Sequence, residues 1–198
     1  MRPQIPLRGS AGVVLLTGAV LLGWSSTACR NVASGVEQHG RIDAAYDEAG
    51  RLTKLAYDSD RNGKPDMWAH MDGARLVRLE ADENEDGRID RWEFYPAEAG
   101  PGGLKQPPER IERSTRDDGR VSRREFFEAG VLVRVEEDTT GDGAVDKWES
   151  YSGGSLAVLA LDTKAQGKPD RRLIYRPDGS LDRVEEDPTG SGEFRAVK

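Results

Sequence analysis

Short apolar segments alternate with polar, Gly-rich segments from residue 45 onward. Segments such as LVRLEA (76–81), RWEFY (91–95) and LVRVEE (132–137) are five or six residues long. That length is too short for a helix and is typical of a β-strand. Turn signals such as EAG, GG and PDG stand between pairs of these segments. The pattern therefore predicts a chain of β-hairpins.

The hairpin pattern recurs along the chain as an internal repeat. With Asp82 as the reference, the equivalent positions are Asp58, Ser114, Asp138, Asp162 and Asp187, at spacings of 24, 32, 24, 24 and 25 residues. Apolar residues stand three and six positions before most of them, as Leu79 and Leu76 do before Asp82. The one long interval contains a Pro/Gly-rich insertion near 96–108, which we interpret as a surface loop. A fixed period of this kind predicts a repeat architecture.

The repeat predicts an all-β fold, an antiparallel β-hairpin meander of about eleven or twelve strands. The sequence leaves open whether the sheet is solenoid-like and open or is rolled into a closed barrel. An apolar spacing of three residues does not match the two-residue alternation of a strand, and a β-bulge would reconcile the two. Trp68, Trp92 and Trp148 share one repeat position, and we interpret them as residues that pack in the core.

The N-terminal segment differs from the repeat region. Arg2 and Arg8 are followed by an uncharged, largely apolar stretch that runs to Ala28. This order predicts a signal-peptide helix at 1–28, a linker at 29–44 and a repeat domain at 45–198. An uncleaved membrane anchor is an alternative, because about 20 uncharged residues can span a bilayer.

The residues Ser26-Thr27-Ala28-Cys29 resemble a bacterial lipobox, in which the Cys is lipidated and becomes the mature N-terminus. Cys29 is the one Cys of the chain. The family has an aliphatic residue where this sequence has Ser26, so ordinary cleavage after Ala28 is the alternative. The resemblance implies export and a lipid anchor in the cell envelope. Arg30 stands where Gram-negative lipoproteins carry an inner-membrane retention Asp, which favours the outer membrane.

The stretch DENEDGRIDRWEFY (82–95) resembles the calcium loop of an EF-hand. Such a loop takes oxygen ligands at positions 1, 3, 5, 9 and 12, a carbonyl at position 7 and Gly at position 6. The predicted ligands in this second loop are Asp82, Asn84, Asp86, Asp90 and Glu93, with the carbonyl of Arg88. The resemblance covers the loop alone, because predicted strands flank it. It implies calcium binding of weak affinity, typical of extracellular modules.

Two sister loops carry a similar set of oxygen donors. In the fourth loop the predicted ligands are Asp138, Thr140, Asp142, Asp146 and Glu149, with the carbonyl of Ala144. In the first loop they are Asp58, Asp60, Asn62 and Asp66, with the carbonyl of Lys64 and no acid at position 12. The third, fifth and sixth loops have lost ligands, as Arg116 and Lys164 at position 3 illustrate. Asp, Asn and Gly are also common in ordinary turns, which is the alternative interpretation of every loop.

Composition narrows the possible partners and chemistries. A net charge of −7 is unsuited to nucleic acid, and one Cys with two His is too few for a Cys/His zinc site. We expect a non-enzymatic envelope lipoprotein whose calcium-stabilised β-repeat scaffold has a structural role or binds an envelope protein or glycan. A metal-free β-repeat protein-interaction module is the alternative. A carbohydrate-active enzyme with two carboxylates beside Trp92 or Trp148 is more remote, because the carboxylates recur whereas a catalytic pair is singular.

Overall fold

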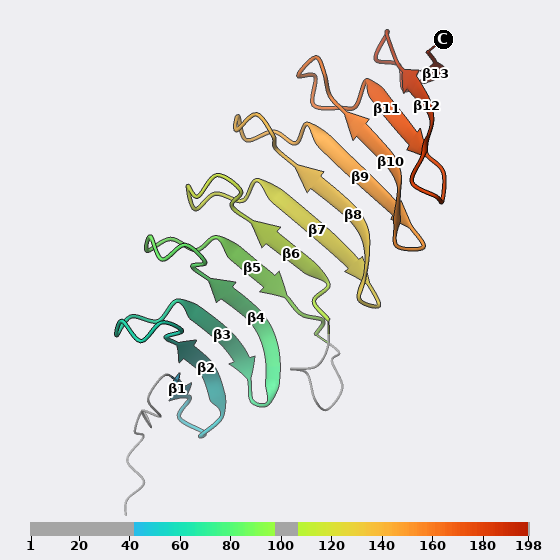
Figure 1. Cartoon of the computed structure of the whole chain (residues 1–198). Helices are drawn as coiled ribbons and strands as arrows, with labels where there is room; N and C mark the ends of the chain where they lie inside the picture. The colour runs from blue at the N-terminus through green and yellow to red at the C-terminus, as the bar shows by residue number, and fades with distance from the viewer. Residues whose placement is uncertain (1–41, 98–106, 198) are drawn as a thin grey trace, which may run out of the picture. The chain divides into compact units, whose positions relative to one another are not determined.

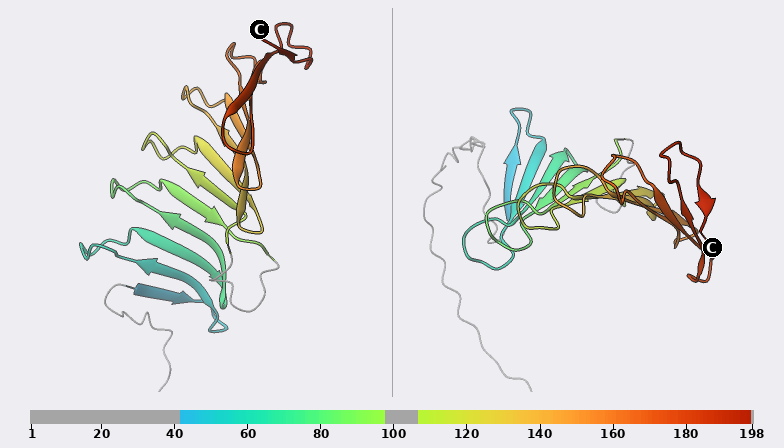
Figure 2. Two further views of the ribbon diagram at one scale, coloured as in Figure 1. Left: turned by 45° about the vertical axis from the view of Figure 1, so that its right-hand side comes forward. Right: turned by 90° about the horizontal axis from the view of Figure 1, so that it is seen from above.

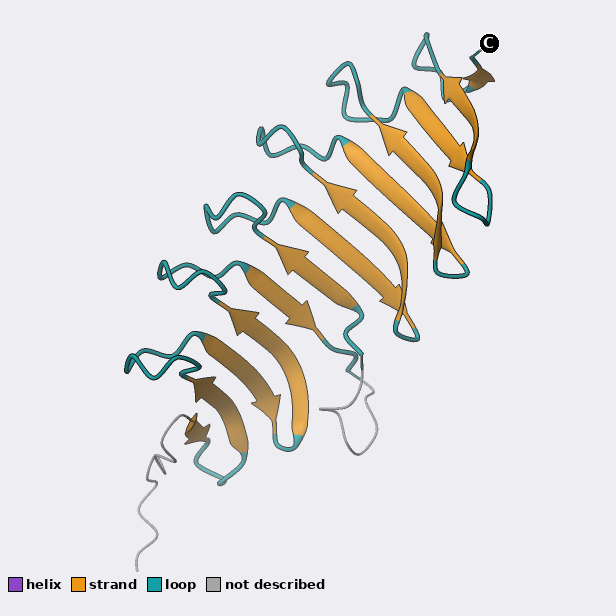
Figure 3. Ribbon diagram, in the orientation of Figure 1, coloured by secondary structure: helices purple, strands orange, loops and turns teal. Residues whose placement is uncertain are grey.

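The computed structural model describes residues 42–97 and 107–197, which form thirteen β-strands (Figure 1; Figure 3). The first seven strands are β1 (Ile42–Tyr46), β2 (Leu52–Tyr57), β3 (Met67–Asp72), β4 (Arg75–Ala81), β5 (Arg91–Phe94), β6 (Arg110–Arg113) and β7 (Arg123–Glu128). The last six are β8 (Val131–Glu137), β9 (Lys147–Ser152), β10 (Ser155–Leu161), β11 (Arg171–Tyr175), β12 (Leu181–Glu186) and the two-residue β13 (Arg195–Ala196). The predicted all-β antiparallel hairpin repeat is confirmed.

Several predictions for the N-terminal part and the insertion lie outside the described residues. They are the signal-peptide helix at 1–28, Cys29, most of the linker 29–44 and the centre of the insertion at 98–106. The strand β1 begins within the predicted linker, and the insertion falls between β5 and β6. Within the described ranges, no helix is long and apolar enough to cross a membrane.

The strands follow one another through a single open sheet in the order of the sequence. Every pair of neighbours is antiparallel, and each strand contacts only the strands before and after it in the chain. The sheet is therefore one layer thick across the described residues, and strand direction turns gradually along it (Figure 2). This result decides between the two predicted forms in favour of the open sheet.

A β-bulge in each tight hairpin explains the three-residue spacing of the apolar residues. In the β3–β4 hairpin, Met71 pairs with Leu76 and His70 with Arg78, so Val77 is the extra residue. The bulge places Leu76 and Leu79 on the same face of the sheet although three positions separate them. The same register shift occurs in the β1–β2, β7–β8, β9–β10 and β11–β12 hairpins.

One face of the sheet carries a row of alternating apolar and acidic side chains. Reading across β4 to β10, the directly paired residues are Leu79, Glu93, Ile111, Glu125, Val135, Glu149 and Leu159. Glu93, Ile111, Val135 and Glu149 are buried although no second layer covers them. Their burial comes from the long side chains on either side in the same face.

The Trp residues of the described ranges, Trp68, Trp92 and Trp148, lie on the opposite face. Each stands next along its strand to a residue that belongs to the row or pairs with it, namely Ala69, Glu93 and Glu149. Trp68 and Trp92 both pair with Glu80, and Trp148 pairs with Glu136. All three Trp side chains are half-buried, because a single-layer sheet has no enclosed core to receive them. Basic side chains cover neighbouring rings, as Arg110 does 4.2 Å from the centre of the Phe94 ring.

Truncation of Val135 tests whether this thin layer depends on cross-strand packing. Val135 has 0% exposed surface, so Val135→Ala should lower the free energy of unfolding by about 1–2 kcal/mol. Val131→Ala is the matched control, because Val131 is 48% exposed, and its effect should stay within about 0.5 kcal/mol. Urea unfolding followed by Trp fluorescence measures both. Equal losses for the two variants would contradict the packing account.

Candidate metal centre in the acidic loops

Six loops of similar backbone shape connect the hairpins at one end of the sheet (Figure 1). We number each loop from 1 to 9, starting at residues 58, 82, 114, 138, 162 and 187, and call them the first to sixth acidic loops. Positions 4 and 6 have positive φ in every loop. At position 6, φ lies between 72° and 91°, as for Gly119 and Gly143, a conformation that favours glycine. This backbone requirement explains the repeated Gly.

The side chain at position 1 caps the loop from inside. Its oxygen accepts a hydrogen bond from the position-6 amide in all six loops. The donors and acceptors are Gly63 to Asp58, Gly87 to Asp82, Gly119 to Ser114, Gly143 to Asp138, Gly167 to Asp162 and Gly192 to Asp187, at 2.6–3.2 Å. The Asp and Gly of the motif thus stabilise the turn whether or not an ion is bound.

The side chain at position 9 closes the other end of the loop. In the fourth loop, Asp146 accepts hydrogen bonds from the Thr139 amide at 3.1 Å and from its hydroxyl at 2.8 Å. The amide at position 1 of each following loop also donates to the position-9 carbonyl, as Asp162 does to Asp146 at 2.8 Å. A Ser or Thr at position 2 is the sequence signal for this closure, and the EF-hand ligand pattern does not include that position.

The first loop gathers three carboxylates at one point. Oxygen atoms of Asp58, Asp60 and Asp66 lie within 4.8 Å of one another, and this is the one such acidic triad among the residues that the structure describes. Carboxylate oxygens are the ligands that calcium and magnesium prefer, so this triad could hold a metal ion. The Asn62 amide group donates to Asp60 at 3.0 Å, and the Asn62 side-chain oxygen accepts from the Lys64 amide at 2.8 Å.

In the second loop, the predicted ligand side chains accept hydrogen bonds from backbone amides of the same loop. Asp82 accepts from Gly87, Asn84 accepts from the Asp86 amide at 3.0 Å, and Asp86 accepts from the Arg88 amide at 2.9 Å. Within the described part of the chain, no three carboxylates of this loop come within the distance that the first loop achieves. The second loop therefore has the ligand types of a calcium site with a wider arrangement.

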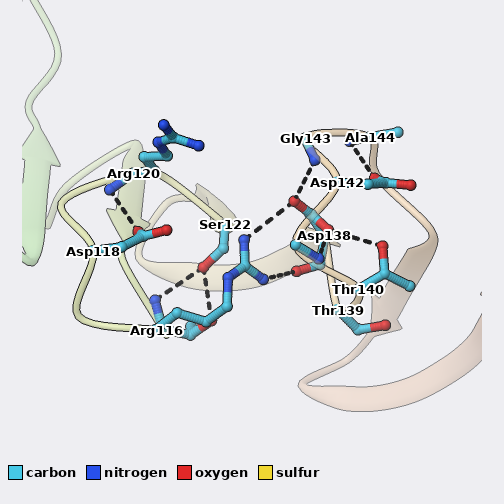
Figure 4. Close-up of polar contacts among 12 residues, drawn as sticks. Arg116, Asp118, Arg120, Ser122, Asp138, Thr139, Thr140, Asp142, Gly143 and Ala144 are labelled. Carbon is cyan, nitrogen blue, oxygen red and sulfur yellow. Dashed lines mark hydrogen bonds and ion pairs between the residues drawn. The ribbon is translucent and has the colours of Figure 1, made fainter.

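The fourth loop receives a cation from its neighbour. The Arg116 side chain of the third loop reaches across to Asp138, as Figure 4 shows. One guanidinium nitrogen donates to the Asp138 carbonyl at 2.8 Å, and another pairs with its carboxylate at 3.2 Å. Burial raises the pKa of Asp138, but the amides of Gly141 and Gly143 and the Arg116 guanidinium together hold it below its usual range.

Glu93 and Glu149, the predicted position-12 ligands, lie in strands β5 and β9. The Glu93 carboxylate bonds with Arg91 and Tyr95, and the Glu149 carboxylate with Lys147 at 2.7 Å and Tyr151 at 2.7 Å. Three residues of strand advance the chain about 10 Å beyond position 9. In an EF-hand a helix begins there instead and returns position 12 to the ion. Both glutamates thus contribute to the sheet face.

These glutamates also affect the tyrosines two residues further along each strand. Burial and the neighbouring Glu149 carboxylate raise the pKa of Tyr151 to about 12. The burial of Tyr95 and its contact with Glu93 raise its pKa as well. The phenols therefore stay protonated at neutral pH and act as hydrogen-bond donors to the carboxylates.

Comparison with known proteins assigns this chain to no family. No protein-family model and no curated protein matches it. Solved structures of TarM, a glycosyltransferase, are similar at 13% identity and a TM-score of 0.26. One, titled "Crystal Structure of TarM", is matched over 58% of this chain and 18% of its own. Another, a S. aureus TarM mutant in complex with fondaparinux, alpha-GlcNAc-glycerol and UDP, is matched over 61% and 20%.

This chain spans about a fifth of the length of the TarM structures that it matches. We withdraw the expectation of a non-enzymatic protein, which these matches do not support. A TM-score of 0.26 supports no assignment of activity to this chain either.

The capping bonds of the fifth loop predict a loss of stability in acid. Amides of Gln166, Gly167 and Lys164 hold the pKa of Asp162 below its usual range, despite some burial. The stabilisation should be complete above the unfolded value of about 3.9 and should disappear as pH falls through the lower folded value. Wild type should therefore exceed Asp162→Asn in urea midpoint by a constant amount above about pH 5, and the difference should shrink below about pH 4. A difference that persists unchanged to pH 2 would contradict this role of the carboxylate.

Proposed function

We propose that this chain is a calcium-stabilised β-repeat scaffold of the bacterial cell envelope. The acidic triad of Asp58, Asp60 and Asp66 is the observation that carries the proposal. Three carboxylates at such short range repel one another, and a divalent cation between them removes the repulsion. Calcium is the ion proposed, because all available donors are oxygen and the loop resembles a calcium loop.

The surroundings of the triad support a cation there. Asp66 is only 8% exposed, so water screens its charge poorly. The Glu85 carboxyl of the second loop lies near Asp60, and this neighbour, with some burial and with Asp66, raises the pKa of Glu85. Negative charge therefore accumulates from two loops around the first site. The side-chain oxygen of Asn62 and the carbonyl of Lys64 are further candidate ligands.

The envelope location in this proposal comes from the sequence. A signal segment ends at Cys29 in a lipobox-like setting, so the mature chain would be exported and held at a membrane by lipid, with the outer membrane favoured over the inner. Within the described residues both faces of the sheet lack a covering layer, which leaves them open to an envelope protein or a glycan. A structural or binding role for the scaffold is consistent with that exposure.

A metal-free β-repeat interaction module is the second candidate. It is favoured by the contact of Arg116 with Asp138 and by Lys164, whose ammonium lies 3.6 Å from Asp170. In those loops the protein supplies its own cation. A sheet that folds in this way throughout would need no calcium.

Thermal unfolding with calcium and with chelator separates the two candidates. A tenfold excess of calcium over its dissociation constant should stabilise the protein by about 1.4 kcal/mol, equivalent to a rise in Tm of roughly 3–5 °C. Asp60→Asn should reduce this rise. Asp178→Asn, in the β11–β12 turn at the opposite end of the sheet, should leave it unchanged.

Identical melting with calcium and with chelator would overturn the calcium scaffold. In that case Asp60→Asn should leave the stability of the chelated protein unchanged or raise it, since it removes repulsion. Either outcome for Asp60→Asn, unchanged or higher stability in chelator, would favour the metal-free module.

A further inference from the structure

The face of the sheet that carries the Trp side chains contains a row of alternating planar and acidic groups. Each residue of this row pairs directly with the next across the strands from β3 to β9, in the order Trp68, Glu80, Trp92, Glu112, Arg124, Glu136 and Trp148. Directly paired residues of antiparallel strands project from the same face, so these side chains form one continuous line, which we call the Trp row. Because neighbouring strands lie about 4.8 Å apart, the row is about 29 Å long and a planar side chain recurs about every 10 Å.

The indole rings of the Trp row are accessible to a partner. All three Trp side chains are half-buried, and no described element covers this face. Lys54 lies 5.8 Å from the centre of the Trp68 ring, and among the described residues no basic side chain lies over the ring of Trp92 or Trp148. The ring of Phe126, one position further along in the next row, is covered by a guanidinium group at 3.9 Å. The Trp row thus presents aromatic surface that the protein itself leaves uncovered.

Opposite charges nearly cancel along this part of the face. Each glutamate of the row forms an ion pair with an arginine two positions away on the same strand, namely Glu80 with Arg78, Glu112 with Arg110 and Glu136 with Arg134. A carboxylate has about four acceptor sites and a guanidinium five donors, so both groups retain hydrogen-bonding capacity beyond the pair. The row therefore offers positioned donors and acceptors without a strong field of either sign, which suits a neutral polar ligand better than a polyanion or a polycation.

A sugar chain combines the chemistry that these groups recognise. The C–H groups of a pyranose ring carry a slight positive charge and stack on the negative face of an indole ring. Its hydroxyl groups donate to carboxylates and accept from guanidinium groups. A linear polysaccharide also repeats along its length, as the row does, so that successive sugar rings can meet successive planar side chains. The surface of a folded protein partner has no such period.

We propose that the Trp row binds a neutral linear polysaccharide whose chain runs across strands β3 to β9. The three Trp rings are the stacking platforms, and the carboxylates between them accept hydrogen bonds from hydroxyl groups. The inference goes beyond the proposed function, because it names a partner for the scaffold and does not depend on bound calcium. It also accounts for Trp residues that recur at one repeat position although no core receives them.

Calorimetric titration of the full chain with neutral hexasaccharides tests the inference. The probes are cellohexaose, chitohexaose and maltohexaose, and an oligomer of galacturonic acid of the same length is the charged comparison. At least one neutral hexasaccharide should bind, and the corresponding disaccharide should bind at least about tenfold more weakly, because it reaches fewer Trp rings. Absence of binding to all three neutral probes, or tighter binding of the charged oligomer, would overturn the inference.

Trp92→Ala should weaken the binding of that hexasaccharide by about tenfold or more, because it removes one stacking platform. Tyr151→Ala is the matched control. Tyr151 is also a half-buried aromatic residue, but its hydroxyl group donates to Glu149 on the opposite face. Tyr151→Ala should therefore bind the hexasaccharide as wild type does. Equal affinities for the two variants would contradict the role of the Trp row.

Arg124→Trp gives a second test that removes no aromatic packing. Arg124 stands at the Trp position of the third repeat, and its side chain is 38% exposed and lies 3.5 Å from Glu112, which keeps Arg110 as its partner after the substitution. The new ring would lie midway between Trp92 and Trp148 and should raise the affinity for the hexasaccharide several-fold. An unchanged or lower affinity in folded Arg124→Trp would count against the inference.

The outcomes separate this inference from the proposed function. If the chain melts identically with calcium and with chelator but binds a neutral hexasaccharide through the Trp row, the proposed function falls and the inference stands. If calcium stabilises the chain but none of the neutral hexasaccharides binds, the inference falls alone.

Discussion

The single layer of strands is the constraint on which the rest of this structure depends. No described element covers either face, so each strand is stabilised only by its two neighbours and by the loops at its ends. Apolar burial is correspondingly small, and buried polar residues outnumber buried apolar ones. Most of the buried polar groups stand at positions 1 and 9 of the acidic loops. The buried part of this protein therefore consists largely of polar side chains that accept hydrogen bonds from backbone amides. Such polar groups are stable when buried only if they have hydrogen-bond partners.

The acidic loops share one backbone conformation but differ in the groups that surround their acidic side chains. In the first loop three carboxylates converge, in the third and fifth a basic side chain reaches an aspartate, and in the second one buried oxygen has no partner. The turn itself needs only the position-1 cap and the two positive φ values. The charge balance of a loop thus depends on single side chains, such as Asp60, Arg116 and Lys164 at position 3, that the turn itself does not need.

The fold could be predicted from the sequence because strand length, turn residues and the repeat all indicate the same hairpin. The spacing of Leu76 and Leu79 fits a strand only with an extra residue between them, which makes a bulge one solution, and the pairing of β3 with β4 shows that bulge. The single-layer architecture of the sheet could not be predicted, because Trp residues recur with the same spacing whether they pack in a core or lie on an open face.

The site was harder to predict than the fold. The ligand pattern identified Asp58, Asp60 and Asp66, which the fold brings together. Glu93 and Glu149 stand at position 12 of the ligand pattern. In this protein position 12 lies in an extended strand that leads away from the loop, whereas in an EF-hand it lies in a helix that returns to the ion. Contacts between loops, such as that of Arg116 with Asp138, join residues 22 positions apart and follow from the pairing of the sheet. A motif within one loop contains no information about them.

Hydrogen–deuterium exchange, resolved loop by loop with calcium and with chelator, tests the central claim most directly. The claim is that metal ions stabilise those loops that lack an internal cation. The amides of Gly63 and Gly87 should gain protection in calcium, while that of Gly167, in the loop that contains Lys164, should exchange at the same rate in both conditions. An equal gain in all three loops, or no gain in any of them, would contradict the account.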